Sequence, residues 1–384
     1  MKINNRIAKL GEYHFKKIDD IKNRIISEGK DVIDLGIGDP DLPVHPSILK
    51  ELVEGLSTKE FNKYPPYDGV LELKEQIIKY YKEVYSVELD LDEVLVLIGS
   101  KEGISNIIPA VCNFGDGIIM TDPAYPVYET AAMLWGAVSH KIALKQKNDF
   151  LPELSNIINN DILKSKLFII NYPNNPTGAV ANESFYKDIV KFCSTNDIVL
   201  CNDAAYNEII EENKAPISIL QYDKNKKNCI EFGTMSKTYN MTGFRIGYAV
   251  GNKKVIKSLL TIKSNLDSGQ FKPIQYAAIQ ALKLDRGYID SIRHIYDGRR
   301  KSAEIILKNK NIDFFKTAAT FYIWCKVPKN YTTYEFCSEA LEKYHIVITP
   351  GYSFGNLGHE YFRIALTQNR GTIEKALNKL NTYK

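Results

Sequence analysis

The sequence predicts an α/β protein whose main sheet is mostly parallel. Short apolar runs recur along the first two thirds of the chain, and amphipathic stretches such as 101–111 and 183–193 separate them. Alternation of strands with helices indicates βαβ crossovers, and apolar character that is continuous and not alternating indicates strands covered on both faces. The predicted strands are Val94–Ile98, Ile118–Met120, Leu167–Ile170, Ile198–Cys201, Ile230–Phe232 and Ile246–Val250.

The pattern changes after Gly251. Lysine-rich helical sequence covers about 279–308, the runs Phe321–Trp324 and Ile346–Ile348 predict a small separate sheet, and Thr372–Leu380 predicts a surface helix. We therefore expect a large α/β domain at 45–280. A smaller α+β domain would combine residues 1–44, which include an N-terminal arm, with residues 281–384.

Composition and charge limit the classes of partner that the protein could bind. The 384 residues carry 50 Lys+Arg against 46 Asp+Glu, a net charge of +4, with 44% apolar residues. This surplus is too small to favour nucleic acid or an anionic membrane, and no apolar run approaches the ~20 residues of a membrane span. We therefore expect a protein that binds neither nucleic acid nor a membrane. No apolar segment of signal-peptide type follows the N-terminus, so we also expect the protein to be cytoplasmic.

The cysteines and histidines indicate no metal site. The six cysteines lie at least eight positions apart, without zinc-ligand spacing, and the histidines are scattered. We expect free thiols, which suit a reducing cytosol. The cysteines are residues 112, 193, 201, 229, 325 and 337.

Polar residues follow the first three predicted strands at the sheet edge where ligands bind in parallel sheets. Gly99–Gly103 opens a helix whose N-terminus favours an anion, although most such loops are plain turns. Asp122–Tyr128 is a turn rich in tyrosine, and Asn171–Gly178 is a proline-stiffened turn rich in amides.

Charged residues follow the next two strands. Asp203 ends an apolar run, and a carboxylate at that depth costs several kcal/mol unless a cation meets it, which could be a structural Arg or Lys or a cationic cofactor nitrogen. Lys237 is a candidate amine nucleophile, and Arg245 could clamp a phosphate. Each residue alone is more often structural. Together they provide what pyridoxal phosphate requires: an amine for its aldehyde, a counter-charge for its ring nitrogen, amide and phenol donors, a stacking ring and a phosphate cup.

Three motifs resemble those of the class I/II pyridoxal-phosphate-dependent aminotransferases. Ser236–Gly247 fits the Ser-Lys-x5-Gly-x-Arg-x-Gly signature, Asn175–Gly178 fits a second hallmark, and Asp203-x-x-Tyr206 fits a third. The resemblance covers essentially the whole chain. It implies fold type I, with a sheet of the seven-stranded type flanked by helices in a large domain, and a smaller α+β domain.

The resemblance also implies residue roles for the cofactor. Lys237 would bond to the cofactor aldehyde and move the proton, and Asp203 would pair with the ring nitrogen. Asn175 and Tyr206 would bond the phenolic oxygen, and Tyr125 would stack on the ring. The residues implied around the phosphate are Ser100, Lys101, Thr234, Ser236 and Arg245.

Further positions are implied for the substrate and for assembly. Arg363 would grip the substrate α-carboxylate, aided by Asn175 and by the loop that contains Gly38. Tyr64 matches a tyrosine that reaches the phosphate of a neighbouring subunit, which implies a homodimer with shared active sites.

Five segments look like the LL-diaminopimelate aminotransferase subgroup, which moves an amino group between LL-2,6-diaminopimelate and 2-oxoglutarate in lysine and cell-wall biosynthesis. The match implies a ping-pong reaction of an amino acid with a 2-oxo acid. The segments are residues 35–43, 98–103, 171–180, 236–243 and 263–269.

Departures from the subgroup pattern keep other readings open. Thr234-Met235, Asn202 and Phe244 replace commoner residues but leave the cofactor set intact, whereas Gly358-His359-Glu360 replaces a more glycine-rich approach to Arg363. The amino donor could instead be aspartate, alanine or an aromatic amino acid. A C–S lyase or a cyclopropane-forming synthase on the same fold is a further alternative. A regulatory protein is disfavoured, because ~45 residues before the large domain are too few for a DNA-binding domain.

Overall fold

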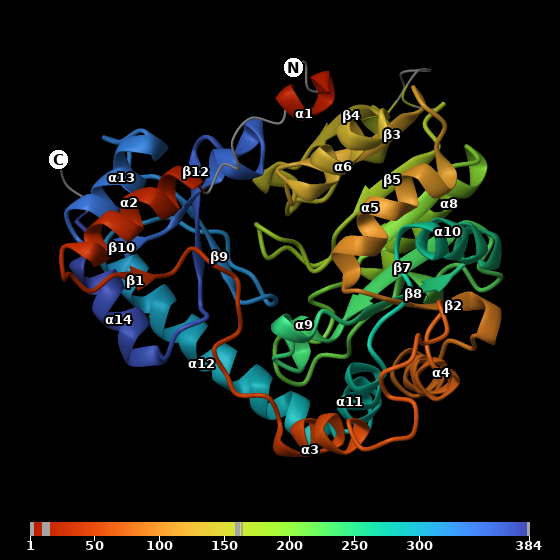
Figure 1. Ribbon diagram of the computed structural model, residues 1–384. Coiled ribbons are helices and arrows are strands. Elements are labelled where there is room, and N and C mark those ends of the chain that lie inside the picture. Colours follow the sequence, from red (N-terminus) through yellow and green to blue (C-terminus); the bar gives the residue numbers. More distant parts are fainter. Residues whose placement is uncertain (1–3, 10–15, 158–161, 163, 382–384) are drawn as a thin grey trace.

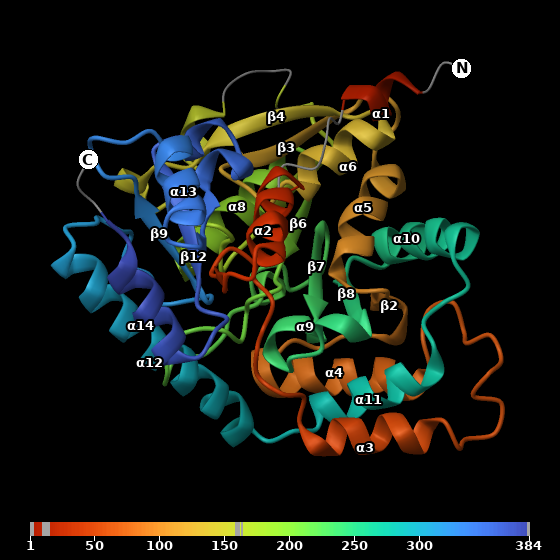
Figure 2. The same cartoon turned by 60° about the vertical axis from the view of Figure 1, so that its left-hand side comes forward.

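A seven-stranded sheet forms the centre of the larger part of the molecule (Figures 1 and 2). The computed structural model describes residues 4–9, 16–157, 162 and 164–381. Six of the strands run in the same direction, and only β8 runs antiparallel to both of its neighbours, which confirms the α/β prediction. In order across the sheet, the strands are β2 (Val94–Leu97), β8 (Gly247–Gly251), β7 (Cys229–Thr234), β6 (Val199–Asp203), β5 (Leu167–Ile170), β3 (Gly117–Asp122) and β4 (Val138–Ala143).

Helices cover both faces of this sheet, which explains the unbroken apolar runs. In β2, Val94 and Val96 pack into one core, while Leu95 and Leu97 pack into the core on the opposite face. The first core is closed by α3 (Pro46–Gly55), α4 (Leu71–Tyr85), α8 (Glu183–Thr195) and α11 (Lys272–Leu282). The second is closed by α5 (Ser100–Val111), α6 (Val127–Trp135) and α10 (Lys253–Leu266).

Two small sheets lie across from the main sheet (Figure 1), where we expected one. Ile346–Val347 pairs in parallel with the N-terminal strand, but the chain then crosses at Ile348 and Thr349–Pro350 joins a separate antiparallel sheet. The strands are β1 (Ile33–Asp34) with β10 (Ile346–Val347), and β11 (Thr349–Pro350), β12 (Tyr361–Ala365) and β9 (Tyr322–Lys326).

The lysine-rich helical sequence expected at about 279–308 corresponds mainly to α12, which spans Arg286–Asn309. It runs from beside α3 and α11 to the small sheets (Figure 1). The division of the chain into domains at residues 44 and 280 stays a prediction. The remaining helices are α1 (Asn5–Lys9), α2 (Lys16–Ser27), α9 (Met235–Thr238), α13 (Thr333–Glu342) and α14 (Arg370–Lys379).

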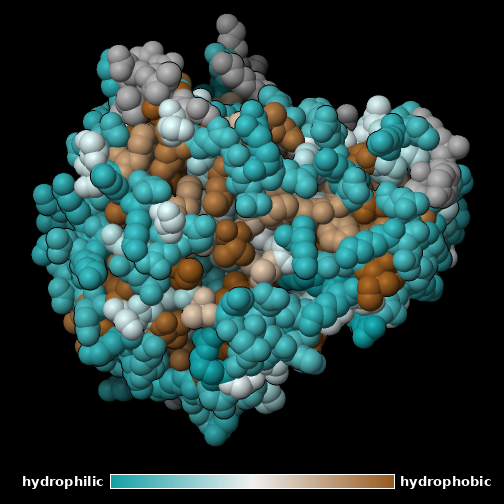
Figure 3. All heavy atoms as spheres, turned by 180° about the vertical axis from the view of Figure 1, so that it is seen from behind, coloured by the Kyte–Doolittle hydropathy of each residue, from teal (hydrophilic) through white to brown (hydrophobic). Residues whose placement is uncertain are grey.

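The surface and the thiols complete the description. All six cysteines are free; five are buried and Cys112 is partly buried. Within the described residues, no helix combines the length and the apolar character needed to cross a membrane. The face seen from behind is mostly hydrophilic, with apolar patches exposed across its middle (Figure 3).

Candidate active site

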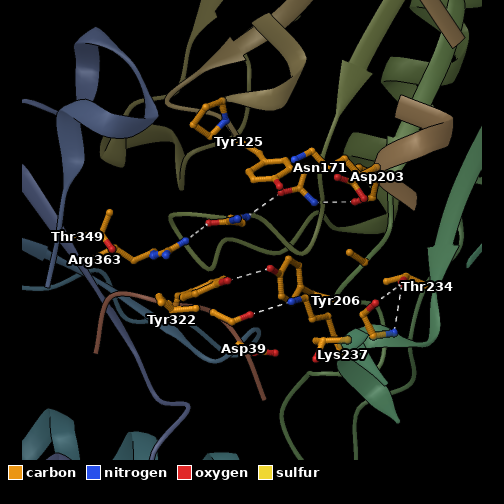
Figure 4. A pocket seen from close by; sticks show the side chains of 18 of the residues that line it. Asp39, Tyr125, Asn171, Asp203, Tyr206, Thr234, Lys237, Tyr322, Thr349 and Arg363 are labelled. Carbon is orange, nitrogen blue, oxygen red and sulfur yellow. Dashed lines mark hydrogen bonds between the residues drawn. The ribbon is translucent and has the colours of Figure 1, made fainter. Parts of the chain in front are cut away.

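A cavity of about 510 Å³ lies at the carboxyl ends of β3, β5, β6 and β7. Residues of the small sheets and of the segment after β1 close its other side (Figure 4). Every predicted site residue lines it except Tyr64, whose side chain is 82% exposed. Those that line it are Gly38, Ser100, Lys101, Tyr125, Asn175, Asp203, Tyr206, Thr234, Ser236, Lys237, Arg245 and Arg363.

Lys237 lies in the short helix α9 directly after β7. Its Nζ donates a hydrogen bond of 2.8 Å to the carbonyl of Gly38, which brings the segment after β1 to the end of the main sheet. Burial lowers the pKa of Lys237 to about 8; the carboxylate of Asp39 opposes this shift, and the charges of Arg363 and Arg245 add to it. The neutral form of this amine is therefore far more populated near neutral pH than that of an ordinary lysine, while the charged form still predominates.

Asp203 ends β6 and is 4% exposed. Its Oδ2 accepts from the Tyr128 hydroxyl at 2.8 Å, whereas Oδ1 has no hydrogen-bond partner among the described residues. Burial raises the pKa of Asp203 to about 6, against the opposing effects of Tyr128, the nearby Ala205 N–H and Lys237. One buried carboxylate oxygen is thus available to a donor in the cavity.

Two tyrosines meet beside this carboxylate. The hydroxyls of Tyr206 and Tyr322 lie 2.9 Å apart, and Figure 4 shows this pair between Lys237 and Arg363. A Cβ at Gly38 would come within 1.8 Å of the Tyr322 hydroxyl oxygen. The close approach of the Gly38 backbone to Tyr322 therefore requires glycine.

Arg363 is a buried cation, 5% exposed, on β12. It donates to Asn175 Oδ1 at 2.6 Å and to the Gly36 carbonyl at 2.7 Å, and its Nε has no partner within the described part of the chain. The guanidinium carbon lies 4.0 Å from the ring centre of Tyr322 and 4.7 Å from that of Phe354. Both partners that hydrogen-bond it are neutral, so its charge is available to a carboxylate in the cavity.

An anion-binding corner lies at the other end of the cavity. The N-terminus of α5 begins there with Ser100, and Thr234 Oγ1 lies 2.9 Å from Ser236 Oγ. Gly99 adopts φ +76°, and a Cβ there would come within 2.7 Å of an Arg245 guanidinium nitrogen. Helix N–H groups, hydroxyls and a guanidinium together suit a phosphate.

Several residues of the site lay outside the prediction, among them Asn171, Tyr128 and Tyr322. Asn171 donates to the Asp203 carbonyl at 2.6 Å and accepts from the Asn175 N–H at 2.7 Å, and Tyr128 bonds Asp203. Both belong to segments singled out in the sequence. Tyr322 belongs to an aromatic strand that was predicted, but nothing in the sequence indicates which of its side chains faces the cavity.

Comparison with known proteins decides the family. The model of the family described as aminotransferase class I and II matches residues 30–380. The chain belongs to this family. It is 43% identical to the LL-diaminopimelate aminotransferase of Natranaerobius thermophilus over 99% of this chain and 98% of that protein. It is 41% identical to the LL-diaminopimelate aminotransferase of Aquifex aeolicus over 99% of this chain and 98% of that one.

Solved structures agree with this membership. A substrate-bound structure of BacF from Bacillus subtilis matches the aminotransferase chain with a TM-score of 0.95 and 31% identity, and covers 100% of both chains. An aspartate aminotransferase from Thermotoga maritima matches with a TM-score of 0.92 and 27% identity, over 98% of each chain. The predicted fold type and enzyme class are confirmed.

Proposed function

We propose that this aminotransferase uses pyridoxal phosphate to move an amino group between LL-2,6-diaminopimelate and 2-oxoglutarate by a ping-pong reaction. The donor assignment rests on relatives named LL-diaminopimelate aminotransferase that are 41–43% identical over nearly the full chain. The observation that carries the chemistry is the placement of Lys237, Asp203 and Arg363 around one cavity.

The cavity fits pyridoxal phosphate at both of its ends. The unpartnered Oδ1 of Asp203 is a buried acceptor suited to a protonated ring nitrogen. The corner formed by Ser100, Ser236 and Arg245 suits the phosphate, and Lys237 lines the same cavity. When bound, the cofactor supplies an aldehyde and an electron-withdrawing ring that makes the Cα proton of an amino acid acidic.

Each residue of the site would have a separate role in the reaction. Arg363 binds the α-carboxylate with its guanidinium fork, which fixes the direction of the Cα–H bond. Lys237, whose lowered pKa makes it easier to deprotonate than an ordinary lysine, removes that Cα proton and later returns one. With the cofactor bound, Asp203 would hold the proton on its ring nitrogen, and Asn175 and Tyr206 would hydrogen-bond its phenolic oxygen.

Two measurements test the proposal. Wild-type protein with pyridoxal phosphate and 2-oxoglutarate should consume LL-diaminopimelate faster than other amino donors, and each turnover should form one glutamate. Lys237→Ala should lose turnover and the absorbance band of the covalently bound cofactor. Full turnover by Lys237→Ala would refute the mechanism, and release of an oxo acid without an acceptor would indicate a lyase.

A second donor class has support of its own. The chain also resembles an aspartate aminotransferase at 27% identity, and Gly358-His359-Glu360 departs from the subgroup pattern close to Arg363. If LL-diaminopimelate is inert in the same screen while aspartate reacts, the donor assignment fails and the cofactor assignment stands.

We further propose that the enzyme works in the cytoplasm as a homodimer in which Tyr64 completes the neighbouring site. The free thiols support a reducing compartment. Tyr64 is exposed outside its own cavity, and Tyr67, Leu266 and Phe271 are also exposed. Residues 65–67 lie against Gly269, because a Cβ at Gly269 would lie 2.9 Å from the Pro65 ring. The exposed side chains on either side of this contact therefore provide an apolar region suited to a second subunit.

A further inference from the structure

Asp122 ends β3 and is buried, with 6% of its surface exposed, yet it does not line the cavity. Its two oxygens accept from the backbone N–H groups of Asn356 at 3.2 Å and Leu357 at 3.1 Å. Those groups begin the short 3-10 turn Asn356–Gly358, which follows the small-sheet strand β11. The carboxylate therefore joins the main sheet to the loop that leads to Arg363.

The backbone on both sides strengthens this junction. Two residues after Asp122, the Ala124 N–H donates to the Phe354 carbonyl at 2.7 Å. Gly355 adopts φ +132°, and a Cβ there would approach Asp122 Oδ1 to 2.2 Å. The loop can meet the carboxylate only because residue 355 is glycine.

The loop held in this way forms one wall of the Arg363 site. Phe354 is buried, lines the cavity and packs against the guanidinium, whose carbon lies 4.7 Å from the centre of its ring. The orientation of the guanidinium plane therefore depends on the position of Phe354. That position depends on the three hydrogen bonds at the end of β3.

We infer that Asp122 is a positioning residue for substrate carboxylates, acting through the 354–357 loop and Phe354 on Arg363. The inference rests on the proposed role of Arg363. Loss of Asp122 should lower the affinity for both substrates, because each presents an α-carboxylate to the same guanidinium. It should leave proton transfer at Lys237 and the cofactor corner largely intact.

Two variants test this inference in the cofactor-loaded enzyme. Asp122→Asn turns an amide donor toward a backbone N–H, and Gly355→Ala drives a methyl group into the carboxylate. Each should raise KM for the amino donor and for 2-oxoglutarate about tenfold and change kcat by no more than about twofold, as expected when a buried charged contact that orients a binding group is lost. The dissociation constant of succinate, a dicarboxylate that cannot react, should rise equally, while that of pyridoxal phosphate stays unchanged.

Asp223→Asn is the matched control. Asp223 is also buried, 7% exposed, and accepts from the backbone N–H groups of Lys227, Asn228 and Cys229, but it does not line the cavity. This variant should lower the melting temperature and leave both KM values unchanged.

Three outcomes would overturn the inference: unchanged KM values in folded Asp122→Asn or Gly355→Ala, an equal rise of KM in Asp223→Asn, or an equal loss of cofactor affinity. If Asp122→Asn does not fold, Gly355→Ala decides the question alone. Failure of the proposed role of Arg363 is distinguishable, because wild-type enzyme would then bind neither succinate nor 2-oxoglutarate.

Discussion

The carboxylate of Asp203 is held where ionisation is unfavourable. Burial raises its pKa to about 6, so the folded chain binds this proton more tightly than the unfolded chain does. Folding stability therefore falls as pH rises from about 4 to about 6, and the loss persists above that range. A residue that serves the cofactor in this way destabilises the cofactor-free protein.

We predict that Asp203→Asn stabilises the cofactor-free protein at pH 8 and abolishes rapid turnover. The amide carries no charge, so the free energy of unfolding should rise by on the order of 2–3 kcal/mol at pH 8 and by less at pH 5. With cofactor, kcat should fall at least roughly 100-fold, because an amide cannot hold the ring nitrogen protonated. Urea unfolding at both pH values measures the first effect, and an equal gain at pH 5 and pH 8 would contradict it.

At the residue scale, the sequence predicted those site residues that follow a strand end in a recognisable motif. Asp203 and Lys237 were found because a charge directly after an apolar run requires an explanation. Tyr322 was missed because an aromatic residue within a strand is ordinarily core. Its role depends on the contact with Tyr206, 116 positions away, which no local pattern reveals.

At the scale of elements, α5 and α10 are joined by a buried ion triad. Lys263 on α10 is 1% exposed and donates to Glu102 on α5 at 3.1 Å and to Asp267 at 2.9 Å. The Asp267 carboxylate also accepts from the Gly269 N–H. The triad links segments 98–103 and 263–269, both singled out in the sequence, and fixes α5, whose N-terminus forms the anion corner.

We predict that Lys263→Met lowers the free energy of unfolding by about 3 kcal/mol, because two carboxylates are left facing each other without a cation. The α5 N-terminus should shift, and the dissociation constant of pyridoxal phosphate should rise. Urea unfolding and equilibrium dialysis measure the two effects. Lys187→Met, which removes an exposed pairing with Glu183, is the control and should leave the free energy of unfolding nearly unchanged. Equal stability of the two variants would refute the role of the triad.

The sequence predicted the buried strands of the main sheet more readily than its exposed edge strand. The predicted runs in β2, β5 and β6 are apolar throughout because helices cover both sheet faces. The edge strand β4 (Val138–Ala143) was missed, since three consecutive polar residues, 139–141, interrupt it and none of its residues is fully buried. The two-residue strands β1, β10 and β11 are too short for any period, and the strand order across the sheet depends on tertiary packing.

At the scale of the whole molecule, the cavity closes only where the main sheet meets the small sheets and the segment after β1. Residues from position 38 to position 363 meet there, which is why motif matching over the whole chain predicted the site better than any local pattern. Tyr64 is the one predicted site residue that does not line the cavity. It is exposed to solvent, so its proposed role in a neighbouring site can be tested only with two subunits together.

We predict that two inactive variants restore activity when their subunits are mixed. In a hybrid of Lys237→Ala with Tyr64→Ala, one site has both defects, while the other combines an intact Lys237 with the partner's intact Tyr64. Random exchange of equal amounts makes half the dimers hybrids with one good site each, so about a quarter of wild-type activity should appear. If Tyr64 acts within its own subunit, both sites of every hybrid stay defective and mixing restores nothing. Sedimentation of each variant confirms that dimers form, so that a failure to restore activity can be assigned to the position of Tyr64 and not to a loss of assembly.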